Sequence, residues 1–436
     1  MADGDSIDRR IAVVGAGVAG LTAAYVLSKT STVTLFEAAD RLGGHADTHI
    51  VATPAHGDLP VDTGFIVHND RTYPTLQRMF RELGVPTQES DMSMSIRCDG
   101  CGLEYSGGQG MSGLVPTAST LVRGRYLRML VEVTRFHRAA RALLRSTDDD
   151  GATVAVADFL AHHQFSQYFE SHFMTPLVSA VWSCEPSRAL DYPARYLFSF
   201  LEHHGMLGVG GSPTWRTVTG GSVEYVRRVA EVIADVRVGT AVSSIRRGEK
   251  SVEIEVASGA SETFDAVVVA THPQQALKML ADPTSTEHLV LGAMPYSPNV
   301  ARLHTDESVL PRAGRARASW NYRMPECDAA PGGVVVTYDM SRLQRLPNTG
   351  SRYLVTLGDE SDASAEGAVL DSSTILETMR YEHPLYTTES VAAQARLPEL
   401  DTDRTVYAGA YHGWGFHEDG AASGLRAATR LGGVWA

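Results

Sequence analysis

Three glycines and one glutamate near the start of the sequence have the types and spacing that bind a dinucleotide. Gly15, Gly17 and Gly20 form a GxGxxG pattern, and Glu37 follows it. The first glycine allows a tight turn, the second lets a pyrophosphate approach the backbone, and the third lets a helix lie close to a sheet. A carboxylate at position 37 accepts hydrogen bonds from ribose hydroxyls and repels a 2′-phosphate, which disfavours NADP and leaves NAD and FAD.

The elements around these residues are predicted to hold them in place. Residues 11–14 are an apolar, β-branched run that is typical of a buried parallel strand. Residues 19–29 predict a helix whose first amides point at the phosphates, and residues 32–37 predict a second strand that ends in the acid. A lone GxGxxG is a weak signal, but strand, turn, helix, strand and acid in register are a specific one.

The next segment separates the two remaining dinucleotides. "EAADRLGGH" places Arg41, Gly43 and Gly44 just after the acid, and "VDTGF" (61–65) predicts another strand that ends in a polar turn. At this point the sequence resembles the flavin-containing amine oxidase superfamily, which includes phytoene desaturases and protoporphyrinogen oxidases. The resemblance implies FAD, with the arginine and the double glycine along its diphosphate and ribityl chain.

The C-terminal segment carries the same resemblance. "TVYAGAYHGWGFHEDGAASGLRAATRL" predicts a strand, a glycine loop and a helix. The resemblance implies that this helix lays its N-terminus against the flavin pyrimidine edge, where its dipole favours the negative charge of the reduced ring. It also places Gly415, Phe416, His417, Glu418 and Gly420 at the isoalloxazine, with Phe416 as an aromatic wall and the amide of His417 on the flavin.

A third segment, 235–273, predicts several short strands that suggest a β-meander, followed by the last buried strand of the sheet, "FDAVVVATHP". The resemblance implies that the first strand passes the adenine at Val236 and Val238. The expected FAD-binding residues are Gly15, Gly17, Val18, Ala19, Gly20, Glu37, Ala38, Arg41, Gly43, Gly44, His45, Thr63, Gly64, Phe65, Val238, Ala270, Thr271, Gly409, Phe416, His417, Glu418 and Gly420. The expected catalytic residues are His417, Phe416, Trp414 and Tyr411.

Longer motifs resemble a narrower bacterial group, the predicted NAD/FAD-binding proteins often found beside cyclopropane-fatty-acid synthases. They include "VDTGFIVHNDRTYPTL", "GSPTWRTVTGGSVEYVRR", "PNVARLHTD" and "ASWNY", and the resemblance runs from Arg10 to Leu431. The sequence departs from the pattern at Trp414, where tyrosine is expected, and at Cys184 in "VWSCEP". Trp414 changes the expected shape of the pocket.

The predicted fold class is α/β: a doubly wound, Rossmann-like FAD-binding domain with a discontinuous α+β substrate domain, as in amine oxidases. We expect the FAD domain at 1–80, 205–275 and 400–436, and the substrate domain at 81–204 and 276–399. Residues 113–204 predict mainly helices and 285–360 mainly strands, with polar loops at 145–153 and 358–368.

Composition excludes some functions. A net charge of −13 disfavours nucleic acid as a partner, because that needs a basic face. No secretion segment or run of about 18 apolar residues is visible, and four cysteines form no disulfide framework, so we expect a cytoplasmic protein. Cys98 and Cys101 form a CxxC, but Cys184 and Cys327 are distant in sequence. We therefore interpret the CxxC as a tight turn between two short strands and expect no metal.

An arginine-rich, amphipathic stretch at 120–145 has two interpretations. It carries Arg123, Arg125, Arg128, Arg135, Arg138, Arg141 and Arg145, with Glu132 as its acid. One interpretation is a peripheral membrane contact that admits a lipid substrate. The one we favour is a solvated helix face, or arginines paired with acids from elsewhere in the fold.

The simplest predicted chemistry is hydride transfer from a substrate carbon to flavin N5, since FAD carries the difficult step. We expect a dehydrogenase or desaturase that acts on a lipid or other apolar small molecule, with an unidentified electron acceptor. The alternatives are an amine oxidase, a redox-neutral double-bond isomerase and, more weakly, a non-catalytic FAD-binding partner. His45, His203, His204, His412 and His417 are the acid–base candidates, each of which is more often structural than catalytic.

Overall fold

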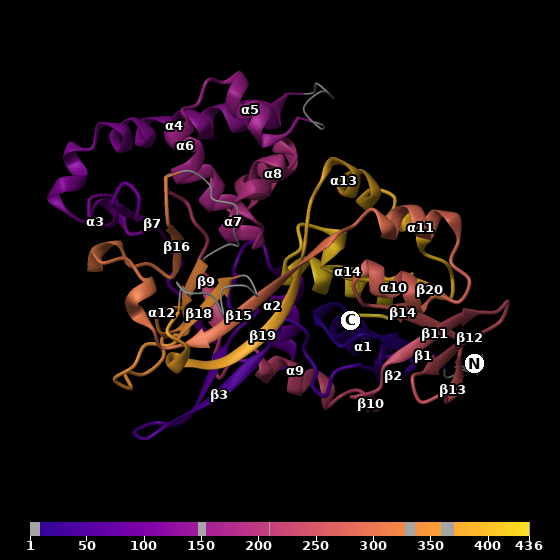
Figure 1. The fold of residues 1–436 in the computed structure, drawn as a ribbon. Coiled ribbons are helices and arrows are strands. Elements are labelled where there is room, and N and C mark those ends of the chain that lie inside the picture. Colours follow the sequence, from indigo (N-terminus) through magenta and orange to yellow (C-terminus); the bar gives the residue numbers. More distant parts are fainter. Residues whose placement is uncertain (1–8, 147–153, 209, 328–335, 359–369, 436) are drawn as a thin grey trace.

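The computed structural model describes residues 9–146, 154–208, 210–327, 336–358 and 370–435. The two predicted polar loops lie largely outside these ranges. Figure 1 shows the described chain in two parts: helices α4–α8 gather at the upper left, and a parallel sheet with α1 lies at the lower right. The long strands β15 and β19 run between them. Among the described helices, none has the length and apolar character that crossing a bilayer requires.

A five-stranded parallel sheet forms the first part. Its order is β10 (Asp235–Arg237), β2 (Thr32–Phe36), β1 (Arg10–Val14), β14 (Ala266–Val269) and β20 (Thr405–Tyr407), with parallel pairing throughout. These strands come from three separate stretches of the chain. The α/β class predicted from the sequence is confirmed, but the strand at 266–269 is not the last of the sheet, because β20 pairs with its free edge.

Both faces of this sheet are covered. Ile11 and Val13 of β1 pack on one face, in a core shared with α1 (Val18–Leu27), α2 (Pro74–Glu82), α9 (Val223–Ala230) and α14 (His417–Arg430). Ala12 and Val14 pack on the other face. That core includes α10 (Pro273–Met279), α11 (Ser285–Gly292) and the meander β11 (Val242–Arg247), β12 (Val252–Val256) and β13 (Ser261–Phe264). Alternate residues of β1 therefore face two cores, which explains its continuous apolar run.

Helices α1 and α14 come from opposite ends of the chain and pack closely. A Cβ atom at Gly424 would lie 2.2 Å from the carbonyl oxygen of Ala19, and one at Gly420 would lie 2.6 Å from Cγ1 of Val18. Arg9 Nη1 also donates a hydrogen bond to the carbonyl of Leu431 at 2.8 Å, 422 positions along the chain. The first part of the molecule is thus closed by its C-terminal helix.

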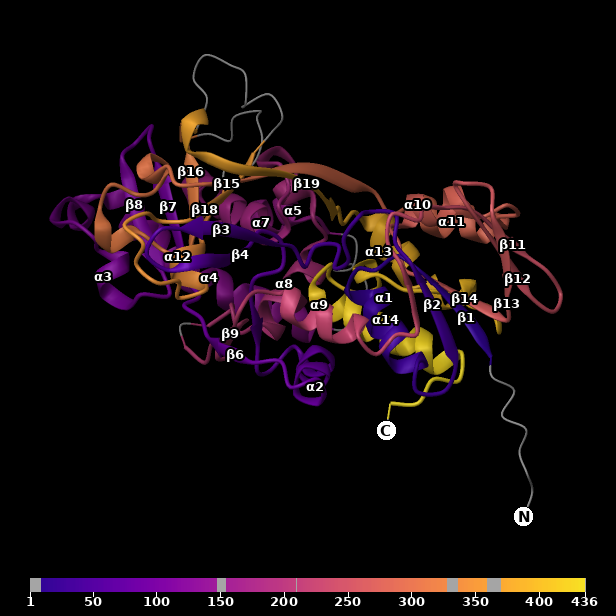
Figure 2. The same ribbon diagram turned by 90° about the horizontal axis from the view of Figure 1, so that it is seen from below.

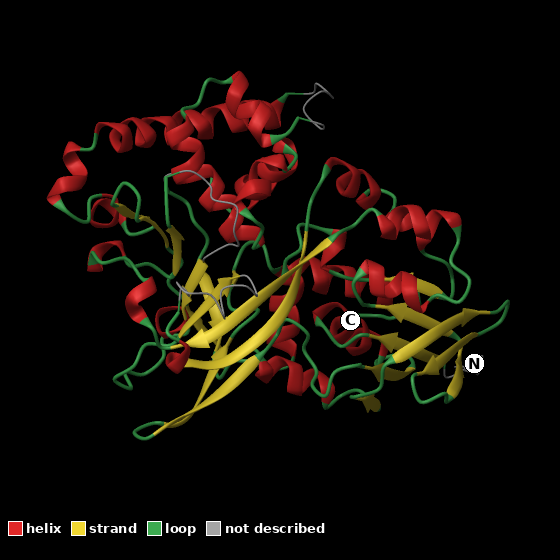
Figure 3. Cartoon of the chain, viewed as in Figure 1, coloured by secondary structure: helices red, strands yellow, loops and turns green. Residues whose placement is uncertain are grey.

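The second part contains a mixed seven-stranded sheet with helices on one side (Figure 3). The strand order is β19 (Ile375–Pro384), β15 (Tyr296–His304), β18 (Leu354–Gly358), β17 (Val336–Asp339), β16 (Trp320–Met324), β7 (Met94–Cys98) and β8 (Leu103–Gly107). The helices are α3 (Gly110–Leu114), α4 (Gly124–Arg145), α5 (Val156–His162), α6 (Gln167–Phe169), α7 (Thr175–Trp182) and α8 (Ala194–His203), with a π-helical turn, Glu170–Met174, between α6 and α7. They share one apolar core with the sheet.

Smaller elements join the two parts. One is the hairpin of β3 (Thr48–Thr53) and β4 (Gly57–Asp62). Another is the small sheet of β5 (His68–Asn69), β9 (Trp215–Val218) and β6 (Thr87–Glu89). The remaining two are the helices α12 (Met340–Leu343) and α13 (Thr388–Gln394). In Figure 2 the β3–β4 hairpin lies along the part that holds β7, β8 and α4. The sequence "VDTGF" therefore ends a hairpin strand, outside the parallel sheet.

Arginines of α4 have mixed surroundings. Arg128 and Arg135 lie near Glu132 of the same helix, at 3.5 and 3.9 Å, and Arg141 pairs with Glu202 of α8 at 3.1 Å. These pairs agree with the interpretation of a solvated, paired helix face. Several apolar side chains along the segment from α3 to α4 are also exposed: Met111, Leu121, Val122, Leu127 and Val131.

Candidate active site

One cavity of about 740 Å³ collects residues from both parts of the molecule. The parallel sheet contributes the turns after β1, β2 and β14 at its carboxyl edge, which is where ligands bind in doubly wound folds. The second part contributes α7, α8 and strands β16–β18. The loop before α14 and the first residues of that helix complete the lining.

At one end of the cavity, Glu37 is fixed by backbone amides. The amide of Ala16 donates to its Oε2 at 2.7 Å, and the amide of Ala39 donates to its Oε1 at 2.9 Å. A carboxylate has about four lone-pair sites, so after accepting these two bonds it can still accept hydrogen bonds from ribose hydroxyls. This is the position and chemistry expected of the acid of a dinucleotide site.

The glycines leave the backbone open to a ligand. A Cβ atom at Gly17 would meet nothing within 4 Å, whereas one at Gly15 would lie 2.6 Å from the carbonyl oxygen of Ala270. Gly15 also has φ +99°, a conformation that favours glycine. Gly44 lies against Gly17, with 3.1 Å from its ideal Cβ position to Cα of Gly17. The N-terminus of α1 and two bare glycine backbones therefore fit a diphosphate.

His417 begins α14 at the middle of the cavity. Its ring stacks on Phe65 at 3.7 Å between centroids and 6° between planes, and its Nε2 lies 2.6 Å from Oη of Tyr225. Burial lowers the pKa of His417 well below its usual value and raises that of Tyr225 well above. The phenol therefore donates, and the neutral imidazole of His417 accepts.

The far end of the cavity is aromatic. Phe416 stacks on Phe200 of α8 at 4.8 Å and 19°, and Trp182 of α7 packs edge-on to Phe416 at 6.2 Å. Helices α7 and α8, the residue that follows each of them, and strands β16–β18 line this end. Their lining residues are Ala180, Val181, Trp182, Ser183, Phe200, His204, Trp320, Tyr338 and Leu357. His204 is the titratable imidazole in this set, and burial lowers its pKa to about 4. This end of the cavity carries no charge near neutral pH.

Other histidines of the cavity are also held neutral. Burial lowers the pKa of His45 to about 4 and that of His383 to about 3, and their rings lie 5.4 Å apart. Nε2 of His45 and Oη of Tyr411 are buried with no hydrogen-bond partner among the described residues. Both line the cavity, so both polar atoms can be satisfied by a ligand.

Most of the predicted site residues line this cavity. They are Gly15, Gly17, Val18, Ala19, Glu37, Ala38, Gly44, His45, Thr63, Gly64, Phe65, Ala270, Thr271, Gly409, Tyr411, Phe416 and His417. Three other predicted glycines lie outside the lining and are closely packed, as predicted for Gly20. An ideal Cβ at Gly20 would lie 1.8 Å from the carbonyl of Gly15, one at Gly43 would lie 2.3 Å from that of Ala46, and Gly420 faces Val18.

Four other predicted residues lie outside the lining: Arg41, Val238, Trp414 and Glu418. Arg41 supports the glycine loop, since its Nη2 donates to the carbonyl of Gly44 at 3.0 Å and to Asp47 at 2.8 Å. Val238 is 45% exposed, and the same segment lines the cavity with Thr240 and Val242. Trp414 lines a separate cavity of about 400 Å³.

Glu418 caps a helix other than its own. Its two oxygens accept hydrogen bonds from the amides of Thr75 at 2.8 Å and Leu76 at 3.0 Å, at the start of α2. The start of α14 is capped instead by Asp419, which accepts from the amide of Phe416 at 2.9 Å. The aromatic residues of α7 and α8 were missed altogether, because nothing in their spacing distinguishes a cavity wall from a core.

The neutral histidines predict how stability depends on pH. An unfolded histidine takes up a proton near pH 6.5, but folded His204 does so only near pH 4, so the free energy of unfolding falls as pH falls between these values. Each such histidine contributes a slope of up to about 1.4 kcal/mol per pH unit. Denaturant unfolding at pH 7 and pH 5 measures it. His204→Gln is expected to reduce the difference between the two pH values, and the exposed control His288→Gln to leave it unchanged. Equal pH dependence in all three proteins contradicts the prediction.

Comparison with known proteins agrees with this geometry. The sequence model of the family described as "Flavin containing amine oxidoreductase" matches residues 18–313. The chain is 25% identical over 301 residues to coproporphyrinogen III oxidase of Mycobacterium leprae (strain TN), which covers 62% of this chain and 61% of that protein. It is 28% identical over 184 residues to the protein of the same description from Mycobacterium tuberculosis (strain ATCC 25618 / H37Rv), covering 40% and 37%. The chain thus spans less than two thirds of these relatives.

Solved structures show the same fold. Cyclohexylamine oxidase from Brevibacterium oxydans IH-35A superposes with a TM-score of 0.69 at 16% identity, covering 97% of this chain and 98% of that one. The fatty acid isomerase from P. acnes that produces CLA superposes with a TM-score of 0.68 at 15% identity, covering 98% and 99%. At such identities the likeness establishes architecture alone.

Proposed function

This chain belongs to the flavin-containing amine oxidoreductase family, and on that premise we propose that it is a dehydrogenase of an apolar acyl or lipid substrate. Its cofactor is FAD, and it is an oxidoreductase. Bound FAD would supply the acceptor for a hydride from a substrate carbon. Gly15, Gly17 and Glu37 would hold the diphosphate and ribose, and the start of α14 would face the flavin ring.

The observation that carries the proposal is the uncharged aromatic end of the cavity. The ionisable side chains of the lining other than histidine and tyrosine are Glu37, Lys278 and Glu382. Glu37 is held at the dinucleotide end, and Glu382 is paired with His272 at 2.8 Å. No carboxylate from α7, α8 or β16–β18 is in the lining to hold a cationic amine. An apolar chain matches such walls, because burying it there removes apolar surface from water.

His204 is the proton acceptor in this proposal. Formation of a C=C bond releases a hydride from one carbon and a proton from its neighbour. Nδ1 of His204 lies 3.0 Å from the carbonyl oxygen of Phe200, so Nδ1 carries the hydrogen and Nε2 keeps its lone pair. Because His204 lines the cavity beside Phe416, with ring centroids 5.9 Å apart, its imidazole is placed at the aromatic end to receive that proton.

We extend the proposal to how the substrate arrives. Exposed Met111, Leu121, Val122, Leu127 and Val131 lie on the segment that also carries the arginines of α4. Apolar side chains beside cations suit a peripheral contact with an anionic bilayer. Acyl lipid in anionic vesicles is therefore expected to be oxidised faster than the same lipid in neutral vesicles.

An anaerobic experiment tests the proposed reaction. FAD-loaded protein is mixed with acyl phospholipid, and the flavin is expected to bleach and to stay bleached until an electron acceptor is added. Mass spectrometry is expected to find a lipid product that lacks two hydrogens. Bleaching with simple amines but not with lipids would make the protein an amine oxidase, and a moved double bond without net oxidation would make it an isomerase. Either result contradicts the proposal.

Val181 of α7 offers a matched pair of variants for the same experiment. It lines the aromatic end, and leucine and asparagine have nearly the same shape. Val181→Asn places an amide against the substrate and is expected to slow lipid oxidation about tenfold, which corresponds to 1.4 kcal/mol of transition-state binding. Val181→Leu is expected to stay near the wild-type rate, and both variants should keep their FAD. Equal slowing by the two variants would mean that polarity at this wall does not matter.

A further inference from the structure

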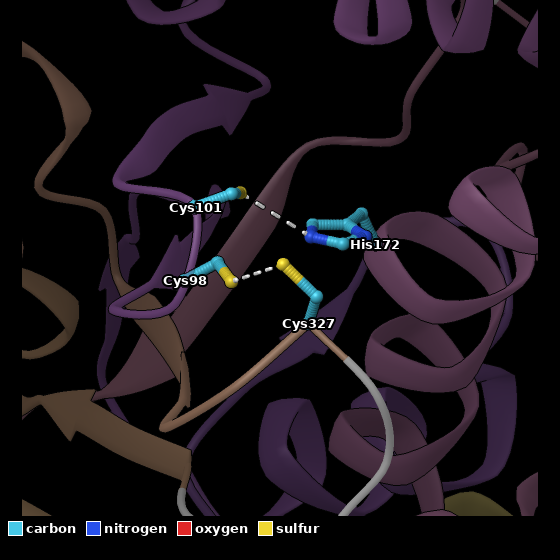
Figure 4. Close-up of side chains that lie close together, drawn as sticks. All are labelled: Cys98, Cys101, His172 and Cys327. Carbon is cyan, nitrogen blue, oxygen red and sulfur yellow. Dashed lines mark hydrogen bonds between the residues drawn. The ribbon is translucent and has the colours of Figure 1, made fainter.

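Three cysteines and one histidine meet far from the flavin-binding turns, in the second part of the molecule. Cys98 ends β7, Cys101 lies in the turn before β8, Cys327 follows β16, and His172 lies in the π-helical turn between α6 and α7. Figure 4 shows the four side chains pointing toward a common centre. Their ligand atoms all lie within 4.8 Å of one another. Cys327, which is distant in sequence, therefore lies beside the CxxC in space. The CxxC itself forms the predicted turn between two paired strands.

The spacing of these atoms matches a single tetrahedral ion. Sγ of Cys98 lies 3.8 Å from Sγ of Cys327, and Sγ of Cys101 lies 3.6 Å from Nε2 of His172. Around tetrahedral zinc, with bonds of about 2.3 Å to sulfur and about 2.0 Å to nitrogen, two sulfurs are about 3.8 Å apart and sulfur and nitrogen about 3.5 Å. A disulfide requires about 2.05 Å, and none joins the four cysteines of the chain.

His172 is oriented as a ligand. The hydroxyl of Ser171 donates to the carbonyl of Gln167 at 3.0 Å, so its oxygen accepts from Nδ1 of His172 at 2.8 Å. This arrangement leaves the lone pair on Nε2, which faces Cys101. Tyr168 stacks on the imidazole at 3.9 Å and 15°, and Tyr105 donates to the carbonyl of His172 at 2.8 Å. Metal-binding histidines commonly show such a hydrogen bond on the second ring nitrogen.

The backbone is shaped around the cluster. An ideal Cβ at Gly100 would lie 3.0 Å from the amide nitrogen of Cys327, so this glycine lets the turn and the loop after β16 approach each other. Strand pairing sets that approach, because Met324 of β16 is in register with Cys98. Arg123 donates to the carbonyls of Cys101 at 2.7 Å and Gly102 at 3.0 Å. Its charge offsets the single negative charge that three thiolates and Zn²⁺ would leave.

We propose that Cys98, Cys101, His172 and Cys327 bind one zinc ion as a closed structural site. Four protein ligands leave no open position for a substrate, which is typical of structural rather than catalytic zinc. The ligand atoms are too close together to surround an iron–sulfur cluster, and they suit a mononuclear ion. The ion ties the β7–β8 hairpin, the loop after β16 and the helices that lead into α7. Since α7 supplies Ala180, Val181 and Trp182, the site supports the aromatic wall of the cavity without taking part in the flavin reaction.

Elemental analysis tests the proposal on the whole protein, purified without chelator from zinc-supplemented cells. Wild type is expected to carry about one zinc per chain. Cys327→Ser and His172→Gln are expected to retain less than about a fifth of that and to melt at a lower temperature. Cys184→Ala, which changes a buried cysteine outside the cluster, is the matched control and is expected to keep its zinc. Loss of zinc from the control alone, or equal zinc in all four proteins, would overturn the assignment.

Two measurements on wild type keep the test independent of whether the variants fold. Replacement of zinc by cobalt is expected to give tetrahedral d–d bands together with thiolate-to-cobalt charge transfer, which report sulfur ligands directly. Thiol titration after unfolding in chelator is expected to find all 4 cysteines reduced. Failure to take up either metal, stoichiometric iron in place of zinc, or the loss of two thiols to a disulfide would each overturn the proposal. These readouts do not depend on the substrate, so they can fail or succeed separately from the proposed dehydrogenase activity.

Discussion

Gly17→Ala is expected to give a folded protein that binds FAD more weakly and is purified with less yellow colour than wild type. The position has φ −70° and ψ 178°, and nothing lies within 4 Å of its ideal Cβ, so the methyl group strains no part of the protein. That same space borders the amides at the start of α1, where the diphosphate must approach. A methyl group there lengthens charge-assisted hydrogen bonds, and the affinity for FAD is expected to fall at least about tenfold, or 1.4 kcal/mol.

Titration of FAD-free protein with FAD, followed by flavin fluorescence, measures this effect. Gly124→Ala is the matched control, because nothing lies within 4 Å of that ideal Cβ either and the residue begins α4, outside the cavity lining. Without FAD, Gly17→Ala and Gly124→Ala should be as stable as wild type or more stable by up to about 1 kcal/mol. If Gly17→Ala binds FAD as wild type does, the diphosphate lies elsewhere.

Gly424→Ala is expected to destabilise the protein itself. Its Cβ would lie 2.2 Å from a backbone oxygen of α1, and a backbone atom cannot swing aside as a side chain can. Helix α14 must therefore move away from α1, at about 1–3 kcal/mol in the free energy of unfolding. Because α14 starts at the cavity, the shift should weaken FAD binding as well.

Denaturant unfolding of FAD-free protein gives the first quantity and FAD titration the second. Gly292→Ala, at the end of α11 with nothing within 4 Å of its ideal Cβ, is the control and should be neutral or stabilising by up to about 1 kcal/mol. A Gly424→Ala protein as stable as wild type would mean that the two helices are not closely packed.

The dinucleotide half of the site could be predicted from the sequence because its signals are local. Strand, glycine turn and helix follow one another within residues 10–27, and each glycine has a role that only a missing side chain can play. Glu37 is the single distant member, and the pairing of β1 with β2 fixes its position. The aromatic wall had no such signal, since Phe200 and Trp182 have the same spacing that core residues of any amphipathic helix have.

The cluster of three cysteines and one histidine could not be predicted from local sequence patterns. Cys98 and Cys101 were visible as a pair, but Cys327 joins them over 229 positions, through the parallel pairing of β16 with β7. His172 is reached only because the helix widens into a π turn at that point. Neither feature follows from local spacing, because strand partners and helix irregularities are decided by the packing of the whole second part.

The close packing of α1 against α14 has a consequence for the order of events in the cell. A ribosome makes α1 before α14, with the rest of the sheet and the second part between them, and every residue of α1 is buried in the folded structure. Strands β1 and β2 and helix α9 can pack against α1 earlier, but the face of α1 that α14 covers stays exposed until α14 is made. The loop before α14 and the first residues of that helix line the cavity, so the cavity is complete only when α14 docks. We therefore expect FAD to bind late in folding.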